Sequence, residues 1–294
     1  MIRPLLVSLR PVQWAKNLFV LAPLVFGRLL GDRVAVGRAL LALLAFCCAA
    51  SAIYLVNDIR DREEDRNHPL KRLRPLAAGT LGVPTAAVAA LVLVGSALAI
   101  SLVLGRAFLA VLGIYVLLNL CYSLGFKHMV ILDVMSISLG FVLRVLAGAQ
   151  ATHVEVSRWL FLCTIFLALF LAFSKRRHEI TLLSDAASGQ RRVLDHYSPA
   201  FLDQMINVVT ASSVVSYALY SVAPETVAKY NTQDLVYTIP LVLYGIFRYL
   251  YLMYQKPGAH NPTEAILRDP PFLINMVLWG LAVVWIVYSG GRPS

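Results

Sequence analysis

Charged residues are scarce in this chain of 294 residues: Asp, Glu, Lys and Arg together make up 14%, while 59% of the residues are hydrophobic. A soluble domain usually carries about 25% charged residues. The charges that are present fall in clusters, which leaves long uncharged runs such as 40–56 between them. This composition excludes an ordinary soluble enzyme and predicts an integral membrane protein.

Several common kinds of chemical site are also missing from the sequence. There is no G-x-x-x-x-G-K-[ST] loop, no H-E-x-x-H pair and no G-x-S-x-G elbow. Cysteines are few, lie in apolar runs and lack metal-ligand spacing, so we expect them to be small core residues: Cys47, Cys48, Cys121 and Cys163. No alternating pattern of about ten residues recurs, which argues against a membrane β-barrel.

Long apolar runs predict the fold. A membrane-spanning helix needs roughly 20 mostly apolar residues. Nine stretches meet this description, near 14–30, 37–56, 83–104, 107–124, 133–151, 158–174, 204–223, 234–254 and 271–289. We therefore expect an all-α polytopic membrane protein with nine transmembrane helices, formed as a single domain over 1–294.

Basic residues are distributed unevenly between the two sides of such a bundle. The N-terminus and the connections after the second, fourth, sixth and eighth helices carry 18 Lys and Arg, and the other side carries seven. The positive-inside rule then places the N-terminus and the charged loops in the cytoplasm. The net charge of +10 fits a surface that faces anionic lipid and an anionic substrate, and we expect no nucleic acid partner.

The strongest signal is the segment 57–75, NDIRDREEDRNHPLKRLRP, which holds five carboxylates and six Lys or Arg directly after an uncharged run. Asp58, Asp61 and Asp65 are spaced three and four residues apart, so they share one face if the helix continues past Val56. Clustered carboxylates suit a hard cation, and Mg²⁺ prefers carboxylate, water and phosphate oxygens. This spacing predicts a Mg²⁺ site that holds a diphosphate.

Basic residues follow these carboxylates closely. Lys71, Arg72 and Arg74 suit the remaining phosphate oxygens, because a guanidinium can bind two oxygens at once. The other charges of the segment can equally form a solvated loop in which they pair with one another: Arg60, Arg62, Glu63, Glu64 and Arg66. The sequence leaves that alternative open for them.

Two further polar groups lie where predicted helices meet the cytoplasm. Asp133 and Arg144 are eleven residues apart, about three turns, and so share a helix face. An ionisable residue that deep in a membrane helix faces a cavity or a partner, so Arg144 binds a ligand or forms a buried ion pair with an aspartate. Tyr122 and Lys127 either bind substrate or anchor the interface. Lys175 either binds substrate or only pairs with Glu179, one turn along the helix.

Two of these motifs resemble those of a known family. The stretch 57–65 is similar to the NDxxDxxxD motif of the UbiA superfamily of membrane prenyltransferases, and Tyr122, Lys127 and Asp133 look like the second motif of that superfamily. Nine cytoplasm-facing helices fit as well, so the resemblance covers essentially the whole chain. It implies a UbiA-type bundle, a cytoplasm-facing active site and dependence on Mg²⁺.

Within the superfamily the chain most resembles members that use a phosphoribosyl donor. The matching stretches are RPVQWAKNLFVLAPL (10–24), NHPLKRLRPLAAG (67–79), YSLGFKHMVILDV (122–134), LGFVLRVLAGA (139–149), FSKRRHE (173–179) and NPTE (261–264). The resemblance implies a transferase of the bacterial inner membrane that moves 5-phosphoribosyl from 5-phosphoribosyl 1-diphosphate to a polyprenyl (decaprenyl) monophosphate. Diphosphate is released, and the product would serve cell-wall arabinan synthesis.

The same resemblance implies roles for individual side chains. Three aspartates would hold Mg²⁺, supported by the amide of Asn57: Asp58, Asp61 and Asp65. The residues implied to bind donor phosphates are Lys16, Lys71, Arg72, Tyr122 and Lys127. Asp133 would position the ribose or a metal. The candidates for the acceptor phosphate are Arg144, Lys175 and Arg177.

One position departs from the family pattern. Many members carry DxxxD in the second motif, but Ile137 stands four residues after Asp133 and Met129 four residues before it, which puts a full second metal site in doubt. A UbiA-type enzyme that prenylates an aromatic acceptor in quinone synthesis remains the alternative. A transporter is disfavoured, because its binding residues usually lie near the membrane midplane. A homo-oligomer is left open.

Overall fold

The computed structural model describes residues 2–67, 71–184, 196–255 and 268–290. Over these ranges the chain forms helices and turns and no strand, which confirms the all-α prediction. Contacts divide it into two compact units, Met1–Val156 (unit 1) and Ser157–Ser294 (unit 2). The stretch NPTE (261–264) and residues 68–70 of the charged segment lie outside the described residues. Whether 1–294 acts as a single domain stays a prediction.

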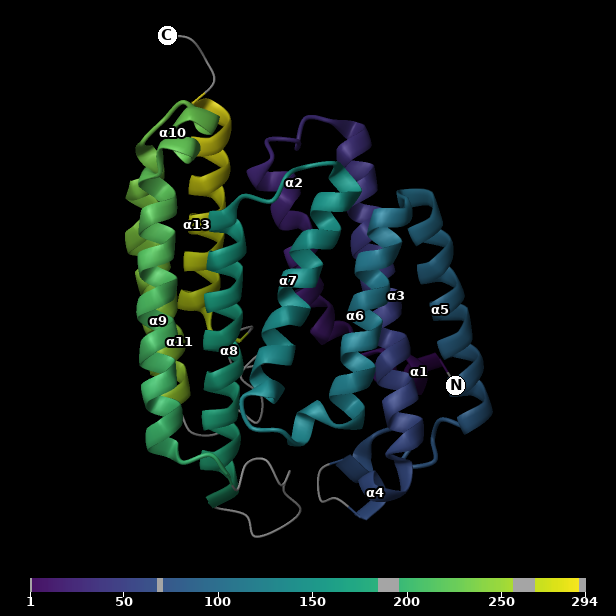
Figure 1. Cartoon of the computed structure of the whole chain (residues 1–294). Coiled ribbons are helices and arrows are strands. Elements are labelled where there is room, and N and C mark those ends of the chain that lie inside the picture. The colour runs from purple at the N-terminus through teal and green to yellow at the C-terminus, as the bar shows by residue number, and fades with distance from the viewer. Residues whose placement is uncertain (1, 68–70, 185–195, 256–267, 291–294) are drawn as a thin grey trace. The chain divides into compact units, whose positions relative to one another are not determined.

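Unit 1 is built on four long helices with shorter ones at their ends. The long helices are α3 (Arg33–Arg60), α5 (Val83–Leu104), α6 (Arg106–Leu124) and α7 (Leu132–Thr152). The shorter ones are α1 (Ile2–Leu9), η1 (Pro11–Leu21), α2 (Ala22–Phe26), α4 (Arg62–Asn67), η2 (Lys71–Leu73) and η3 (Phe126–His128). Figure 1 shows α4 and the α6–α7 turn at the same end of unit 1.

Small side chains let α3 pack closely against its neighbours. Its buried residues include Ala39, Ala42, Ala45 and Ala49, and it packs against α5, α6, α7 and η1. In lipid, apolar burial gives little driving force for helix association, so close packing must supply it. Small residues at the interface allow the helix backbones to approach closely enough for such packing. The larger side chains of this core, such as Phe46, meet rings from α6. Helix α3 is therefore the central helix of unit 1.

The end of unit 1 opposite α4 is held by backbone capping. Asp32 accepts hydrogen bonds from the amides of Val34 and Ala35 and so caps α3. Arg38 donates to the carbonyls of Leu104 and Ala151, the last turns of α5 and α7. Gly105 has φ 113°, a left-handed value that favours glycine, and joins α5 to α6 without a loop.

Unit 2 is a second helical bundle. Its elements are α8 (Arg158–Ser184), α9 (Pro199–Val222), α10 (Pro224–Tyr230), η5 (Asp234–Thr238), α11 (Ile239–Gln255) and α13 (Pro270–Ser289). Helix α8 packs against α9, and α11 packs against α13. The carboxylate of Asp269 caps α13 through the Phe272 amide and also pairs with Arg248 of α11. This one side chain thus fixes where α13 starts and which helix it contacts.

Eight helices of the described residues are long and apolar enough to cross a membrane. They correspond to eight of the nine predicted spans, and the boundaries of 83–104 are reproduced without change. The ninth span, 14–30, is not confirmed, because the chain there forms the 3-10 helix η1 and the short α2. Pro11 and Pro23 start these two pieces, and a proline cannot donate the hydrogen bond that would continue a helix across it.

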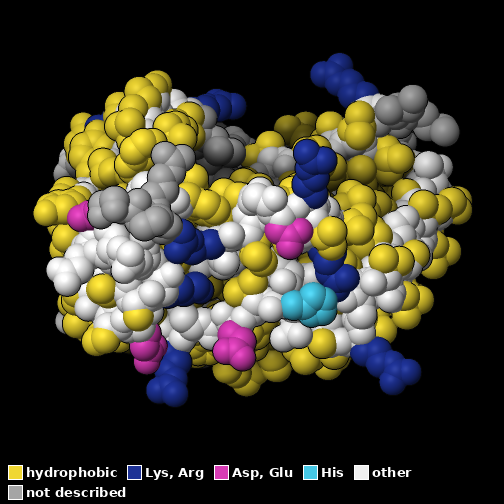
Figure 2. All heavy atoms as spheres, turned by 90° about the horizontal axis from the view of Figure 1, so that it is seen from above, with side chains coloured by type: hydrophobic (Ala, Val, Ile, Leu, Met, Phe, Trp, Pro, Cys, Tyr) yellow, Lys and Arg dark blue, Asp and Glu magenta, His cyan; other side chains and the backbone are white. Residues whose placement is uncertain are grey.

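The outer surface is apolar along the spanning helices. Leu91, Leu102, Val103 and Trp285 are among many large hydrophobic side chains that are more than half exposed. Figure 2 shows the molecule from above, where hydrophobic side chains cover much of the visible surface and Lys, Arg, Asp and Glu lie among them. Exposed apolar area on this scale marks a surface that lipid covers. The protein is therefore a multi-pass membrane protein, and its orientation stays a prediction.

Candidate functional site

The candidate site begins at the last turn of α3, where Asp58 is 3% exposed. Arg10, at the start of η1, donates from Nη2 to Asp58 Oδ1 across 2.6 Å. Arg74, which follows η2, donates from Nη1 to the same oxygen across 3.2 Å. A buried carboxylate stays charged only with such partners, because removing it from water is otherwise costly. Two segments far apart in sequence thus converge on Asp58.

Asp65 completes the centre of the site from α4. Its side chain is also almost fully buried, and Arg74 Nη1 lies 2.6 Å from Asp65 Oδ2. Lys71 Nζ lies 3.9 Å from the other oxygen of the same carboxylate. A single guanidinium nitrogen therefore bonds Asp58 and Asp65 together. The two carboxylates lie on either side of one cationic atom.

Asp61 does not join this pair. It lies at the break between α3 and α4, is partly exposed, and its nearest cation is Arg60 at 3.8 Å. Within the described ranges, no three side chains of His, Cys, Asp or Glu gather into a metal-binding group. Mg²⁺ is usually bound through one or two carboxylates plus substrate phosphates. Asp58 and Asp65, already gathered around a cation, match that donor set.

The chain between the two aspartates and Arg74 folds back through backbone carbonyls. Arg62 donates to the carbonyl of Leu76, and Arg66 donates to the carbonyl of Ala77. Leu76 itself is fully buried against Leu55 of α3. The turn is therefore anchored to unit 1, which holds Arg74 over the aspartates.

Several charges of 57–75 do follow the solvated alternative. Glu63 is highly exposed and pairs with Arg66 one turn later. Arg60 is exposed and donates to the carbonyl of Ser123 at the end of α6. Arg62 and Arg66 also bond backbone carbonyls, so these arginines have a structural role in addition to carrying charge.

The second predicted group lies at the α6–α7 turn, at the same end of unit 1 as α4 (Figure 1). Asp133 lies in the first turn of α7 and is fully buried. Tyr122 is half-buried near the end of α6. Lys127 lies in η3, half-exposed, and makes no hydrogen bond or ion pair within the described part of the chain. An ammonium without a partner among the described residues suits an anionic ligand.

The remaining predicted residues of unit 1 differ in burial. Asn57 precedes Asp58 in α3 and is half-buried, and Lys16 is half-buried in η1. Arg72 is exposed on η2. The structure thus brings Asp58, Asp65 and Lys71 into contact, and it leaves Asp61 and Arg72 outside that contact network.

Arg144 lies in the middle of α7 and is 7% exposed. Its Nε donates to Asn17 Oδ1 at 2.8 Å, its Nη2 to the Tyr115 hydroxyl at 2.9 Å, and its Nη1 to the Gly140 carbonyl at 2.8 Å. No carboxylate of the described residues pairs with it, so the buried ion pair that the sequence allowed is not formed. The guanidinium instead joins η1, α6 and α7 through neutral groups.

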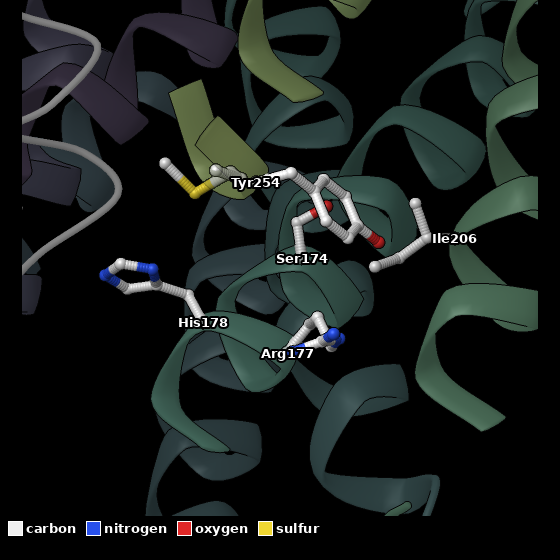
Figure 3. A pocket seen from close by; sticks show the side chains of 6 residues that line it. Ser174, Arg177, His178, Ile206 and Tyr254 are labelled. Carbon is white, nitrogen blue, oxygen red and sulfur yellow. The ribbon is translucent and has the colours of Figure 1, made fainter. Parts of the chain in front are cut away.

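Lys175 and Arg177 belong to unit 2, and both already have acidic partners there. Lys175 lies 3.8 Å from Glu179, as the pairing alternative predicted. Arg177 donates to Asp203 at 2.8 Å, and Tyr254 donates to the same carboxylate oxygen at 2.6 Å. Figure 3 shows Ser174, Arg177 and Tyr254 together in a pocket of this unit, whose lining also includes Ile206.

Sequence reasoning missed two residues of the site. Arg10 was assigned no role, although it lies in a stretch that carried the family resemblance. Arg74 was grouped with the phosphate-binding residues by its charge but was not assigned a ligand. The signal for both was present as a basic residue within a matching stretch. Only the fold shows that these two arginines share Asp58.

Comparison with known proteins gives three consistent findings. The model of the UbiA prenyltransferase family matches residues 20–268. A decaprenyl-phosphate phosphoribosyltransferase of Corynebacterium glutamicum is 37% identical over 288 residues, which cover 96% of this chain and 86% of that protein. The protein of the same name in Mycobacterium tuberculosis is 32% identical over 295 residues, covering 98% and 93%.

The fold is similar to solved structures over nearly its full length. A UbiA homologue from Archaeoglobus fulgidus bound to GPP and Mg²⁺ has a TM-score of 0.70 and 19% sequence identity, covering 98% of this chain and 99% of that one. A digeranylgeranylglyceryl phosphate synthase structure has a TM-score of 0.66 at 18% identity, covering 98% and 99%. At this level of identity the likeness shows the fold alone.

Proposed function

Because the chain belongs to the UbiA prenyltransferase family, we propose that it is a Mg²⁺-dependent phosphoribosyltransferase. The donor is 5-phosphoribosyl 1-diphosphate, and the acceptor is a polyprenyl monophosphate, of decaprenyl length in the similar enzymes by their name. One observation carries the proposal: two buried carboxylates share one cation at the end of α3, in a chain similar over almost its whole length to phosphoribosyltransferases. The product would serve cell-wall arabinan synthesis.

The reaction requires charge neutralisation more than acid or base chemistry. An oxygen of the acceptor phosphate forms a bond to ribose C1 while the bond from C1 to the diphosphate breaks. The phosphate nucleophile is already ionised at neutral pH, so no strong general base is needed. The work of the protein is then to position two anionic substrates and to stabilise the departing diphosphate.

The donor would bind at the α3–α4 end of unit 1. Bound Mg²⁺ would clamp the diphosphate and stabilise its developing charge. We assign the ion to Asp58 and Asp65, and Asp61 and Asn57 remain supporting candidates. The unpaired ammonium of Lys127 favours a role in binding donor phosphate oxygens, and we assign the same role to Lys16, Lys71, Arg72 and Tyr122. Asp133 would contact the ribose or a metal.

The acceptor phosphate needs a cation that a carboxylate does not already neutralise. Arg144 meets this requirement among the three residues predicted from the sequence, because its bonds go to neutral groups. Lys175 and Arg177 are each paired with an acidic residue. We therefore favour Arg144 and keep Lys175 and Arg177 as secondary candidates.

The deciding experiment uses membranes or purified protein with labelled phosphoribosyl diphosphate and decaprenyl phosphate, with and without EDTA. We expect a labelled lipid that EDTA abolishes and added Mg²⁺ restores. Absence of this lipid, together with prenylation of an aromatic acid from a prenyl diphosphate, would establish the alternative UbiA-type activity instead. For the location, we propose the bacterial inner membrane with the N-terminus and the site on the cytoplasmic side, supported by the 18 basic residues of that side.

A further inference from the structure

Arg74 occupies the position between the two buried carboxylates where a metal ion would bind. Its Nη1 atom lies 2.6 Å from Asp65 and 3.2 Å from Asp58. A cation held jointly by these carboxylates would come too close to this nitrogen, both sterically and by like-charge repulsion. The guanidinium and a metal ion shared by both aspartates therefore exclude each other.

The charges around the pair disfavour a bare metal ion further. Arg10 and Lys71 lie against the same two carboxylates, so three cations already surround two anions. A divalent ion alone would add positive charge to a cluster that is already net positive. A diphosphate that carries the ion brings more negative than positive charge. The cluster is thus electrostatically matched to the metal–diphosphate complex and not to the free metal.

The Arg74 side chain can also move out of this position. It follows η2 outside any helix, and its side chain is 30% exposed, whereas the aspartates are 3% exposed. A guanidinium can bind two oxygens of a phosphate at once, just as it can bind the two oxygens of a carboxylate. Once displaced from the carboxylates, the Arg74 guanidinium can therefore move a short distance to the oxygens of the incoming diphosphate.

We infer that Arg74 is a donor-phosphate ligand that holds the metal position closed until diphosphate arrives. In the substrate-free protein it neutralises Asp58 and Asp65. When the metal–diphosphate complex binds, Arg74 exchanges the carboxylates for phosphate oxygens and the metal takes its place. This inference rests on the proposed function for the identity of the donor, but its central claim concerns only metal and diphosphate.

The test measures Mn²⁺ binding, as a paramagnetic substitute for Mg²⁺, by electron paramagnetic resonance on the full chain in nanodiscs. Wild type, Arg74→Gln and Arg3→Gln are compared with and without inorganic diphosphate. Arg3 is the matched control, because its replacement removes the same charge from an exposed side chain of α1 that takes no part in the aspartate pair. In wild type we expect weak Mn²⁺ binding that diphosphate strengthens about tenfold or more.

Arg74→Gln should change both properties in opposite directions. Mn²⁺ alone should bind about tenfold more tightly than in wild type, and diphosphate should strengthen that binding much less. Arg3→Gln should behave as wild type. The inference is overturned if Arg74→Gln leaves Mn²⁺ affinity unchanged or lowers it, or if diphosphate strengthens Mn²⁺ binding in the variant as much as in wild type.

Two precautions keep this result interpretable. If Arg74→Gln does not fold, Arg74→Lys is used instead. Lysine keeps the positive charge but lacks the planar guanidinium, so it should hold the two carboxylates less firmly. We expect Arg74→Lys to bind Mn²⁺ more tightly than wild type does. Failure of the phosphoribosyl transfer assay would leave the Mn²⁺ and diphosphate measurements intact. The failure of the proposed function and the failure of this inference are therefore separate outcomes.

Discussion

Arg10 and Asp58 form a 2.6 Å ion pair between the start of η1 and the last turn of α3. Arg10 itself has a left-handed backbone, with φ 55°, and its guanidinium also lies over the Tyr54 ring, 4.7 Å from the centroid. The N-terminal segment is thus fixed directly to a carboxylate of the site. Whatever binds at Asp58 is connected through this pair to the position of η1.

Replacing Arg10 should therefore weaken the site. Hydrogen bonds to charged groups contribute about 1.5–3 kcal/mol, so we expect Arg10→Ala to lower kcat/KM for phosphoribosyl transfer by about 10- to 100-fold. The assay is formation of labelled phosphoribosyl lipid. Arg3→Ala removes an exposed arginine of the same segment and should leave the rate unchanged. Equal effects of the two variants would show that only the net charge of the segment matters.

The three predicted metal ligands should not be equivalent. Asp58→Asn and Asp65→Asn remove the two carboxylates that share Arg74, and a lost metal clamp of several kcal/mol lowers kcat by about 100- to 1,000-fold. Asp61 pairs with Arg60 and not with Arg74, so Asp61→Asn should lower kcat by about tenfold or less. Turnover at saturating Mg²⁺ measures all three. Equal losses in the three variants would instead support a three-carboxylate site.

The sequence predicted the helices better than the contacts between them. Apolar length alone located α5, α6, α7 and α13 to within one or two residues, because the thickness of the bilayer sets both ends. The span 14–30 is not confirmed, because the apolar run there is divided between η1 and α2, with Pro23 in the first turn of α2. Hydrophobicity does not register a missing backbone donor, so composition could not show that break.

The sequence predicted which kinds of side chain form the site but not which of them pair with one another. The sequence predicted a cluster of Asp58, Asp61 and Asp65; α3 does continue past Val56, and two of the three, Asp58 and Asp65, share Arg74. The spacing could not show that α3 ends at Asp61, or that Asp61 lacks the contact with Arg74 that the other two aspartates share. The pairing of Asp58 with Arg10, 48 residues earlier, depends on tertiary packing that no local pattern encodes.

Lys127 should affect donor binding more than turnover. Its ammonium has no partner within the described part of the chain, so removing it breaks no internal contact. We expect Lys127→Ala to raise KM for phosphoribosyl diphosphate about tenfold with little change in kcat, as for uniform binding of ground and transition states. His128→Ala, at the exposed neighbouring position, serves as the control. An unchanged KM would show that Lys127 only anchors η3 at the membrane interface.

Replacing Arg144 should weaken binding of the lipid acceptor and leave binding of the donor unchanged. Arg144→Lys keeps the charge but cannot bond Asn17, Tyr115 and Gly140 simultaneously, so we expect KM for decaprenyl phosphate to rise about tenfold while KM for the donor stays unchanged. Arg38→Lys is the matched control: Arg38 also bonds neutral acceptors in unit 1, but at the end opposite α4.

The two lysine variants should lose similar stability, and a thermal unfolding scan of each in detergent checks this expectation. If both raise KM for decaprenyl phosphate equally, the effect reflects loosened packing of unit 1. Arg144 would then be a structural residue that joins η1, α6 and α7.

The orientation of unit 1 can be tested by labelling single cysteines in intact cells. The four native cysteines are first replaced, because all of them lie in spanning helices. Ala78 and Arg106 are both exposed but lie at opposite ends of α5. We expect a membrane-impermeant maleimide to label Arg106→Cys in intact cells and Ala78→Cys only after permeabilisation. This pattern follows if the basic α4 end faces the cytoplasm, where phosphorylated sugar donors are made. Labelling of Ala78→Cys in intact cells would place the carboxylate pair on the outer side and overturn the proposed topology.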